Sequence, residues 1–216
     1  MSNDLDIYLA ATEFLDCGEP SIQHLAESLK QSTPQATAVT LFDWVRDNVR
    51  YDPYVAIADR PSYRASAVLE SRRGHCVQKA LLLAALARAL GIPTRLGFAD
   101  VRNHKASPKM LALMGTNLFV FHGYVEFFLD GRWVKATPAF DPEVSRRAGV
   151  LPVELDGSND AMFHPVDPQG HPFIEYVRDR GTYADLPFEE MLATLAEVYS
   201  DRIEAWQAEH LTRQGH

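Results

Sequence analysis

Cys76 is the residue whose setting most clearly suggests chemistry. It follows Gly74-His75 and opens a run of Ala, Leu and Arg that reaches Gly91 without a proline, so it stands in the first turn of a predicted long helix. The unpaired N–H groups and the positive dipole end of that turn favour a thiolate over a thiol. The sequence therefore offers Cys76 as a nucleophile for acyl transfer.

A nucleophilic cysteine needs a base, and His122 is the best candidate among the eight histidines. It lies in a predicted strand, 117–129, that is followed by the strong hairpin signal Asp130-Gly131. A two-residue turn places Phe128 opposite Trp133 and Glu126 opposite Lys135, which are favourable cross-strand pairs. The same register predicts that His122 faces Ala139 on the returning strand.

The base in turn needs an orienting partner, and two residues on the returning strand are diagonal neighbours of His122. These are Thr137 and Asp141. Asp141 is the better electrostatic choice, because a carboxylate stabilises the imidazolium and fixes its tautomer. Pro138 and Pro142 each remove a ladder donor, so the strand is expected to bulge or to end before Asp141. Thr137 therefore stays open as the alternative third member.

Composition narrows the class of protein. The 216 residues carry a net charge of −8, which argues against nonspecific binding to nucleic acid or to an anionic membrane. No apolar run has the length of a membrane span, and the acidic N-terminus lacks the pattern of a signal peptide. The two cysteines, Cys17 and Cys76, form no disulfide framework, which favours a cytoplasmic location. His75 and Cys76 have no further ligand at metal spacing, so neither a metal nor a cofactor is predicted.

The remaining chain supplies the elements that must position these residues. Apolar residues at helical spacing predict helices over 5–15, 22–29 and 33–48, a short one over 65–69 and a closing one over 187–207. Period-two segments predict strands over 94–101, 117–129, 133–139 and 173–177. The segment 145–172 is rich in Gly, Asn, Asp and Pro and predicts a long loop.

Two segments together resemble the transglutaminase-like superfamily. One is Gly74-His75-Cys76 opening an Ala/Leu-rich helix that ends Leu90-Gly91-Ile92-Pro93, and the other is His122-Gly123-Tyr124-Val125-Glu126 followed by Gly131-Arg132-Trp133. The resemblance covers about 41–141, within a domain predicted to span 1–216. It implies an α+β fold with a papain-like core, in which helices pack on a small antiparallel sheet and the nucleophile stands at a helix N-terminus.

The resemblance also implies roles for single residues. Cys76 matches the nucleophile and His122 the base. Members of the superfamily usually have Asp followed by Pro shortly after the Trp, whereas this chain has Thr137-Pro138 and its nearest acid is Asp141. An oxyanion hole would combine the backbone N–H of Cys76 with one upstream donor, for which Tyr63 is the first candidate and Tyr54 the second.

These residues predict a cysteine enzyme that transfers an acyl group from a peptide or protein amide through a thioester. The chain shows no Asp/Glu cluster that resembles a calcium loop, so hydrolysis is favoured over regulated crosslinking. One alternative is a weak or inactive module that binds a peptide or protein in the same cleft, suggested by the displaced acid. A second alternative is acyl transfer of the arylamine N-acetyltransferase type, which uses the same Cys/His/Asp logic.

Overall fold

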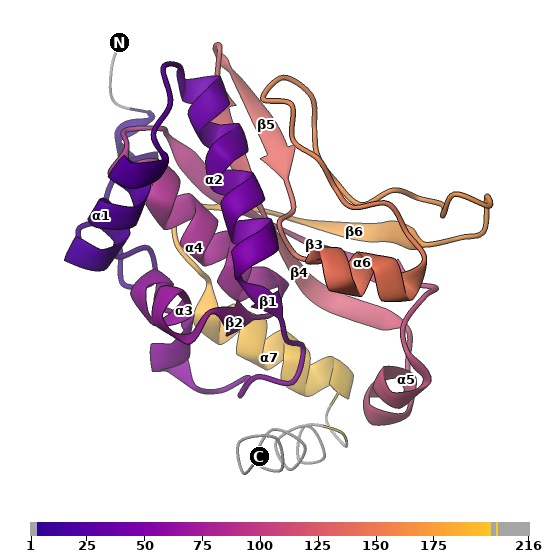
Figure 1. Cartoon of the computed structure of the whole chain (residues 1–216). Coiled ribbons are helices and arrows are strands. Elements are labelled where there is room, and N and C mark those ends of the chain that lie inside the picture. Colours follow the sequence, from indigo (N-terminus) through magenta and orange to yellow (C-terminus); the bar gives the residue numbers. More distant parts are fainter. Residues whose placement is uncertain (1–3, 200–201, 203–216) are drawn as a thin grey trace.

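A buried central helix organises the fold. The computed structural model describes residues 4–199 and 202, and α4 (Cys76–Ala89) lies between three helices and the main sheet (Figure 1). Those helices are α1 (Pro20–Leu29), α2 (Pro34–Asn48) and α3 (Ala65–Ser71). Every residue of α4 from Val77 to Arg88 is buried. Most of its side chains are apolar, and a helix with apolar residues on nearly every side is stable only inside a core.

The two ends of α4 are defined by local sequence. His75 accepts a hydrogen bond from the N–H of Val77, and the Gln78 side chain accepts one from the backbone N–H of His75, which together form a capping box. At the other end, Gly91 adopts a positive φ of 74° just before Ile92-Pro93, a sequence that cannot continue a helix. The start of α4, where Cys76 lies, is therefore fixed by side chains as well as by packing.

The main sheet has four antiparallel strands in the order β5-β4-β3-β6. Their bounds are β3 (Thr94–Asn103), β4 (Leu118–Leu129), β5 (Arg132–Ala136) and β6 (Ile174–Tyr183). A second, two-stranded sheet pairs β1 (Arg50–Tyr51) with β2 (Arg73–Gly74) in parallel. Helices packed on a small antiparallel sheet confirm the predicted α+β class.

The hairpin between β4 and β5 has the predicted register. Phe128 pairs with Trp133 and Glu126 with Lys135, and both turn residues, Asp130 and Gly131, have a positive φ, as a type I′ turn requires. The prediction of a strand that continues to 139 was wrong, because β5 ends at Ala136. Pro138 has no N–H for the ladder, and the pairing of His122 with Ala139 is not formed.

Other differences from the sequence prediction fall outside the central elements. The helix predicted over residues 5–15 was wrong, since this segment forms only a short 3-10 turn, η1 (Asp6–Tyr8), followed by turns and bends. Two short helices were missed, α5 (Pro108–Met114) and α6 (Pro142–Ala148), and β6 is longer than predicted. A second 3-10 turn, η2, spans Arg60–Tyr63, and α7 spans Phe188–Tyr199. The predicted extension of the closing helix to 207 lies outside the described residues.

Within the described residues, no helix is both long enough and apolar enough to span a bilayer.

Candidate active site

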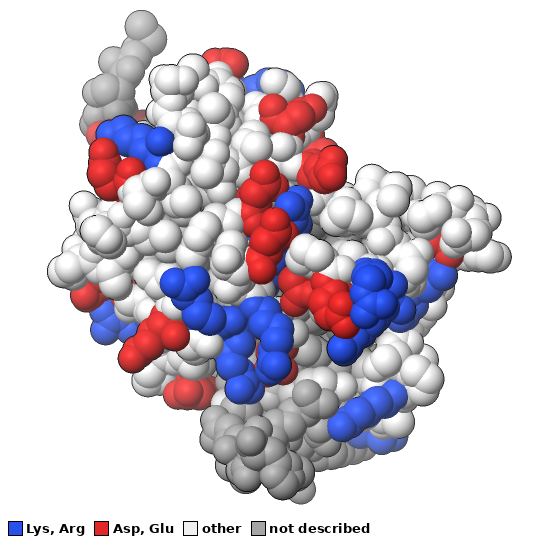
Figure 2. Space-filling view, viewed as in Figure 1, with Lys and Arg blue, Asp and Glu red and all other residues white. Residues whose placement is uncertain are grey.

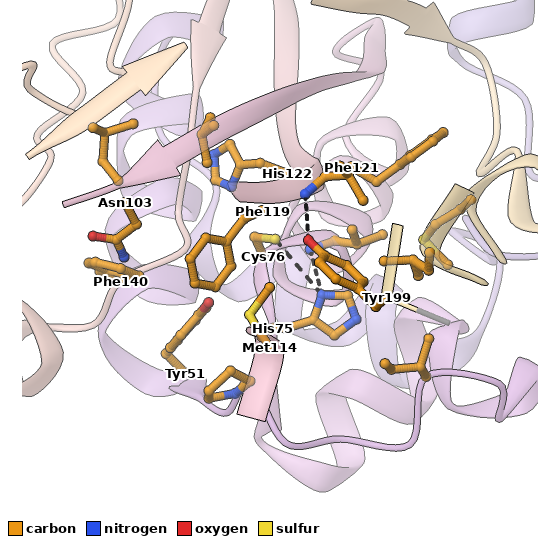
Figure 3. Close-up of a pocket in the computed structure, with 18 of the residues that line it drawn as sticks. Tyr51, His75, Cys76, Asn103, Met114, Phe119, Phe121, His122, Phe140 and Tyr199 are labelled. Atoms are coloured by element: carbon orange, nitrogen blue, oxygen red, sulfur yellow. Dashed lines mark hydrogen bonds between the residues drawn. The ribbon is translucent and has the colours of Figure 1, made fainter. Parts of the chain in front are cut away.

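Cys76 occupies the first position of α4 at the floor of a pocket, with its side chain partly exposed (Figure 3). Burial raises the pKa of the thiol, while the backbone N–H groups of Gly123, Val77 and Cys76 itself lower it only in part. The expectation that the helix N-terminus alone lowers this pKa is therefore not met. Loss of water around the sulfur outweighs the helix terminus, which favours the neutral thiol over the thiolate.

His122 reaches this pocket because β4 is irregular directly before it. Ala99 of β3 pairs with His122 and Val101 pairs with Phe119, so two residues of β4, Val120 and Phe121, stand opposite Asp100. This is a β-bulge, and Phe121 adopts a positive φ of 56° in it. A bulge redirects the side chains that follow it, and here the next side chain is the imidazole of His122.

A buried ion pair stabilises the bulge. The carboxylate of Asp100 accepts a hydrogen bond of 3.1 Å from the N–H of Phe121, a group that the bulge leaves without a ladder partner. Arg180 holds the same carboxylate in a bidentate pair of 2.5 and 2.9 Å. Arg180 is itself the extra residue in a second bulge, on β6, since Phe98 pairs with Gly181 and Ala99 with Asp179. The two bulges therefore meet at Asp100.

Gly123 allows the strand that carries His122 to touch the helix that carries Cys76. A Cβ atom at position 123 would lie 2.9 Å from the Cα of Val77 and 3.3 Å from its nitrogen. Contacts shorter than 3.0 Å with backbone do not occur for real Cβ atoms, so only glycine permits this approach. The close packing of β4 on the first turn of α4 brings base and nucleophile into one pocket.

The hydrogen-bond partner of His122 is Thr137. Its hydroxyl oxygen lies 3.2 Å from Nε2 of His122, and both residues are buried. Thr137 directly follows β5 and is held in place because its N–H donates to the carbonyl of Ala161. The alternative third member that the sequence left open is thus the residue in contact with the imidazole.

Asp141 does not contact His122 but serves two backbone groups elsewhere. Its Oδ1 accepts from the N–H of Val144 at 2.8 Å and caps α6, while its Oδ2 accepts from the N–H of Tyr51 at 2.7 Å. The preferred orienting role of Asp141 does not fit this geometry. The physical reason is the end of β5 at Ala136, after which the chain turns away and begins α6 at Pro142.

The pKa of His122 reflects the fact that its hydrogen-bond partner is the hydroxyl of Thr137 and not a carboxylate. Burial, with a smaller contribution from the nearby His75, lowers the pKa of His122 to about 3. A carboxylate at hydrogen-bond distance would oppose this shift, but the residue present is an uncharged threonine. The resting pair is therefore a neutral imidazole and a neutral thiol rather than an ion pair.

His75 is a second imidazole beside the thiol. Its Nδ1 lies 3.8 Å from the Sγ of Cys76 and also accepts from the N–H of Val77, and its Nε2 lies 3.0 Å from the hydroxyl of Tyr63. Burial lowers the pKa of His75 to about 4. Sequence reasoning weighed His75 only as a metal ligand, and the described residues include no group of three or more His, Cys, Asp or Glu placed to hold an ion. The missed signal was a histidine at an N-cap position.

Both tyrosines predicted for the oxyanion hole are otherwise engaged. Tyr63 is fully buried and its hydroxyl contacts His75. Tyr54 packs in a separate apolar cluster with Met110 and Tyr199, and its ring lies 5.5 Å from the Nζ of Lys109. The hydroxyl of Tyr63 is therefore already engaged with His75, and the role of Tyr54 stays a prediction.

Tyr51 is a tyrosine of the pocket that sequence reasoning did not consider. It pairs with Gly74, two residues before Cys76, and its ring packs edge-on against Phe140 at 5.0 Å. In Figure 3 the ring of Tyr51 points from its strand toward the part of the pocket that holds Cys76. Burial and the charge of an ionised Cys76 both raise the pKa of Tyr51, so its hydroxyl stays protonated as a donor. The two-residue strand β1 gave too short a pattern to be recognised.

A wider groove lies beside the thiol pocket. The pocket has a volume of about 90 Å³, and the neighbouring groove one of about 1130 Å³. The two are adjacent, and Tyr51, Pro53, Asn103, Phe119 and Phe140 line both. Figure 2 shows side chains of both charges over α2, α3 and α6 on the face drawn there. The site therefore combines a small inner pocket at the sulfur with a long polar approach.

These features define a class of protein: an α+β fold with a cysteine at the start of a buried helix and a histidine on an adjacent antiparallel strand. The sequence model of the transglutaminase-like superfamily matches residues 23–138. That match covers more than half of the chain, and the chain belongs to the transglutaminase-like superfamily. No match was found among curated proteins.

Solved structures with similar folds are distant in sequence. A candidate cysteine protease from Cytophaga hutchinsonii has 18% identity and a TM-score of 0.48, over 85% of this chain and 55% of that one. The periplasmic domain of TgpA from Pseudomonas aeruginosa has 20% identity and a TM-score of 0.44, over 63% of this chain and 48% of that one. The chain thus matches only about half of the length of these two relatives.

Proposed function

We propose that this protein is a cysteine-dependent acyl-transfer enzyme that cleaves an amide bond through a thioester, with water as its main acceptor. The observation that carries the proposal is the convergence of Cys76 and His122 in one pocket, with the far nitrogen of the imidazole held by Thr137. A nucleophile, a base and an orienting group in this order form the general arrangement of nucleophilic catalysis. The proposed substrate is a peptide or protein amide that lies in the adjoining groove.

The proposed chemistry begins with a neutral pair. When Nε2–H of His122 donates to the hydroxyl of Thr137, the lone pair of Nδ1 is left to accept the thiol proton. The sulfur then forms a bond to the substrate carbonyl carbon, and the C–N bond breaks as the imidazolium returns its proton to the leaving amine. Water, deprotonated by the same imidazole, hydrolyses the thioester and restores the thiol.

Stabilisation of the tetrahedral intermediate is assigned to two kinds of donor. The backbone N–H groups at the first turn of α4 are one, as expected at a helix N-terminus. The hydroxyl of Tyr51 is proposed as the second donor, in place of Tyr63 and Tyr54. Asp141 supports this role indirectly, because its carboxylate holds the N–H of Tyr51.

The role of Tyr51 can be isolated by comparing two reagents that attack the same sulfur. Acylation by p-nitrophenyl acetate forms an oxyanion, whereas alkylation by iodoacetamide forms none. Tyr51→Phe is expected to slow acylation about 10- to 100-fold and to leave alkylation unchanged. Tyr63→Phe, which removes a hydroxyl that contacts His75 instead, serves as the matched control. Equal losses with both reagents would contradict the assignment of Tyr51.

The catalytic proposal itself is tested by the burst of p-nitrophenolate that accompanies acylation of the enzyme. The experiment uses the Cys17→Ser protein, so that Cys76 is the only thiol, with Cys76→Ala as the control. A stoichiometric burst that disappears in Cys76→Ala and is at least tenfold slower in His122→Ala is the expected result. A burst that is absent, or that survives Cys76→Ala, would overturn the proposal.

One observation favours a second candidate, a module that binds a peptide without cleaving it. The pKa of Cys76 is raised and its base is oriented by a hydroxyl instead of a carboxylate, both of which weaken a nucleophile. A binding module predicts saturable peptide binding with no burst.

The cytoplasmic location stays a prediction, and one of the similar structures is a periplasmic domain.

A further inference from the structure

The inner pocket around Cys76 differs chemically from the rest of the molecule. Although 23% of the residues in the chain are charged, the described residues that line this pocket include no Lys, Arg, Asp or Glu. Its walls are mostly aromatic and aliphatic side chains from β4, α5, α7 and the loop between β5 and α6. They include Met114, Phe119, Phe121, Phe140, Met191 and Leu195.

Among the described residues that line the pocket, the titratable bases are two histidines, and both are uncharged at neutral pH. His75 and His122 line it, and burial lowers their pKa values to about 4 and about 3. A charged group entering the pocket would lose its water and find no opposite charge, which is strongly unfavourable. An apolar group gains from the same loss of water.

The outer groove has the opposite character. Its lining includes charges of both signs, such as Arg50, Arg72, Arg147, Asp47 and Glu143. Several of these side chains are well exposed, for example Arg50 at 69% and Arg147 at 73%. A polar or charged chain is therefore tolerated along the approach, and the discrimination falls on the group that lies at the sulfur.

We propose that the inner pocket selects an uncharged, apolar acyl group, so that the residue whose carbonyl Cys76 attacks carries an aliphatic side chain. This inference rests on the proposed acyl-transfer function and specifies its substrate class. The cavity of about 90 Å³ is several times the roughly 10–15 Å³ that one water needs, and is smaller than the roughly 150 Å³ of a cavity that binds benzene. Side chains of the size of Val, Leu or norleucine fit this range better than large aromatic ones.

The same chemistry disfavours a lysine side chain as the acyl acceptor. A lysine ε-ammonium would have to lose its proton and its water to reach the thioester. Water and neutral amines have no such cost. The pocket therefore supports hydrolysis over protein crosslinking through lysine.

The test compares acyl donors that differ in charge but little in size. The probes are the p-nitrophenyl esters of N-acetyl-norleucine, N-acetyl-lysine and N-acetyl-glutamate, with the rate of the burst measured in the Cys17→Ser protein. The norleucine ester is expected to acylate Cys76 at least about 100-fold faster than either charged ester, as for a charge moved into a site without a partner. Similar rates for all three esters would overturn the inference.

A second test adds a positive charge to the pocket and asks whether the preference then moves toward the negatively charged ester. Phe119 is only partly buried and lines both pocket and groove, so Phe119→Lys is expected to shift the ratio of glutamate to norleucine rates upward at least tenfold. Val177→Lys adds the same charge at an exposed position on β6 and should leave the ratio unchanged. Alkylation by iodoacetamide, which is uncharged, checks that the thiol of each variant is intact.

The possible failures are distinguishable. If no ester acylates Cys76, the proposed function fails. If esters acylate Cys76 without regard to charge, the enzyme is real and the selection of an apolar acyl group is wrong. An unchanged ratio in Phe119→Lys, with alkylation intact, would likewise overturn the inference.

Discussion

The two halves of strand β4 differ in the regularity of their backbone and of their pairing. From Gly123 to Leu129 the strand is regular, pairs with both neighbours and ends in a turn that its sequence dictates. From Leu118 to His122 it bulges, has a non-glycine residue with a positive φ, and donates backbone hydrogen bonds to the distant side chains of Tyr199 and Asp100. The regular half stabilises the sheet, and the irregular half positions the imidazole of His122 in the pocket.

Each half has its own buried carboxylate with an arginine partner, which makes the comparison testable. Glu126 belongs to the regular half itself, whereas Asp100 lies on β3 opposite the irregular half. Glu126, in the regular half, pairs with Arg95 at 2.6 Å, on the β3–β4 pair, away from the thiol. Asp100 pairs with Arg180 at 2.5 Å and also accepts from the bulged N–H. The first pair is expected to affect stability alone, whereas the second should affect stability and catalysis together.

The largest effect is expected from removing Asp100. Asp100→Ala leaves a buried arginine and a buried N–H without their acceptor, which should lower the free energy of unfolding by about 3–5 kcal/mol. Asp100→Asn keeps an acceptor and should fold, with acylation slowed about tenfold. Urea denaturation and the burst rate measure these effects. Glu126→Gln is the control, and a burst rate that falls equally in Glu126→Gln and Asp100→Asn would refute the distinction between the two halves.

The next effect concerns the contact between β4 and α4. Gly123→Ala places a Cβ against the backbone of Val77 and should lower the free energy of unfolding by about 1–3 kcal/mol while slowing acylation at least tenfold. Gly18→Ala is the matched control, because a Cβ there has nothing within 4 Å. A Gly123→Ala protein with normal acylation would show that the close approach is not needed for the chemistry.

Acid should destabilise the protein through His122. Its pKa is lowered to about 3 in the folded state, whereas the unfolded value is about 6.5, so between these values the unfolded chain binds more protons. Stability therefore falls as pH drops below about 6.5, by about 2 kcal/mol at pH 5 from this one group. Urea denaturation at pH 7 and pH 5 measures the loss. His122→Gln should reduce the difference, and an unchanged difference would argue against a buried neutral imidazole.

The smallest effects separate the two candidates for the third member. Thr137→Val removes the hydroxyl from His122 and should slow acylation about tenfold, the loss expected for a hydrogen bond of about 1.4 kcal/mol. Asp141→Asn should leave acylation within about twofold and lower stability by about 1 kcal/mol, as for a weakened helix cap. The reverse ranking of the two burst rates would restore Asp141 as the orienting residue.

The regular parts of this structure could be predicted because their signals are local. The helix after Cys76 follows from its composition, and the hairpin follows from Asp130-Gly131 together with alternating side chains. The observed pairing of Phe128 with Trp133 confirmed the register that these features predicted. The superfamily resemblance likewise rested on short segments, and the match to the superfamily model confirmed it.

The rest could not be predicted because it depends on contacts between distant segments. The bulge at Phe121 requires Asp100 and Arg180, from two other strands. Tyr51 reaches the pocket through a two-residue strand that has no pattern of its own. The choice between Thr137 and Asp141 depended on where β5 ends, and the raised pKa of Cys76 depended on burial by the surrounding walls.

The central claim is that a neutral His122 takes the proton of a neutral Cys76 thiol. The most direct measurement is the rate of acylation of Cys76 by p-nitrophenyl acetate between pH 5 and pH 8, in Cys17→Ser and in Cys17→Ser with His122→Ala. With His122 present, the rate should be nearly constant, because the imidazole stays a base over this range. In His122→Ala the rate should be low and should rise about tenfold per pH unit as the thiolate forms. Identical pH profiles for the two proteins would contradict the account.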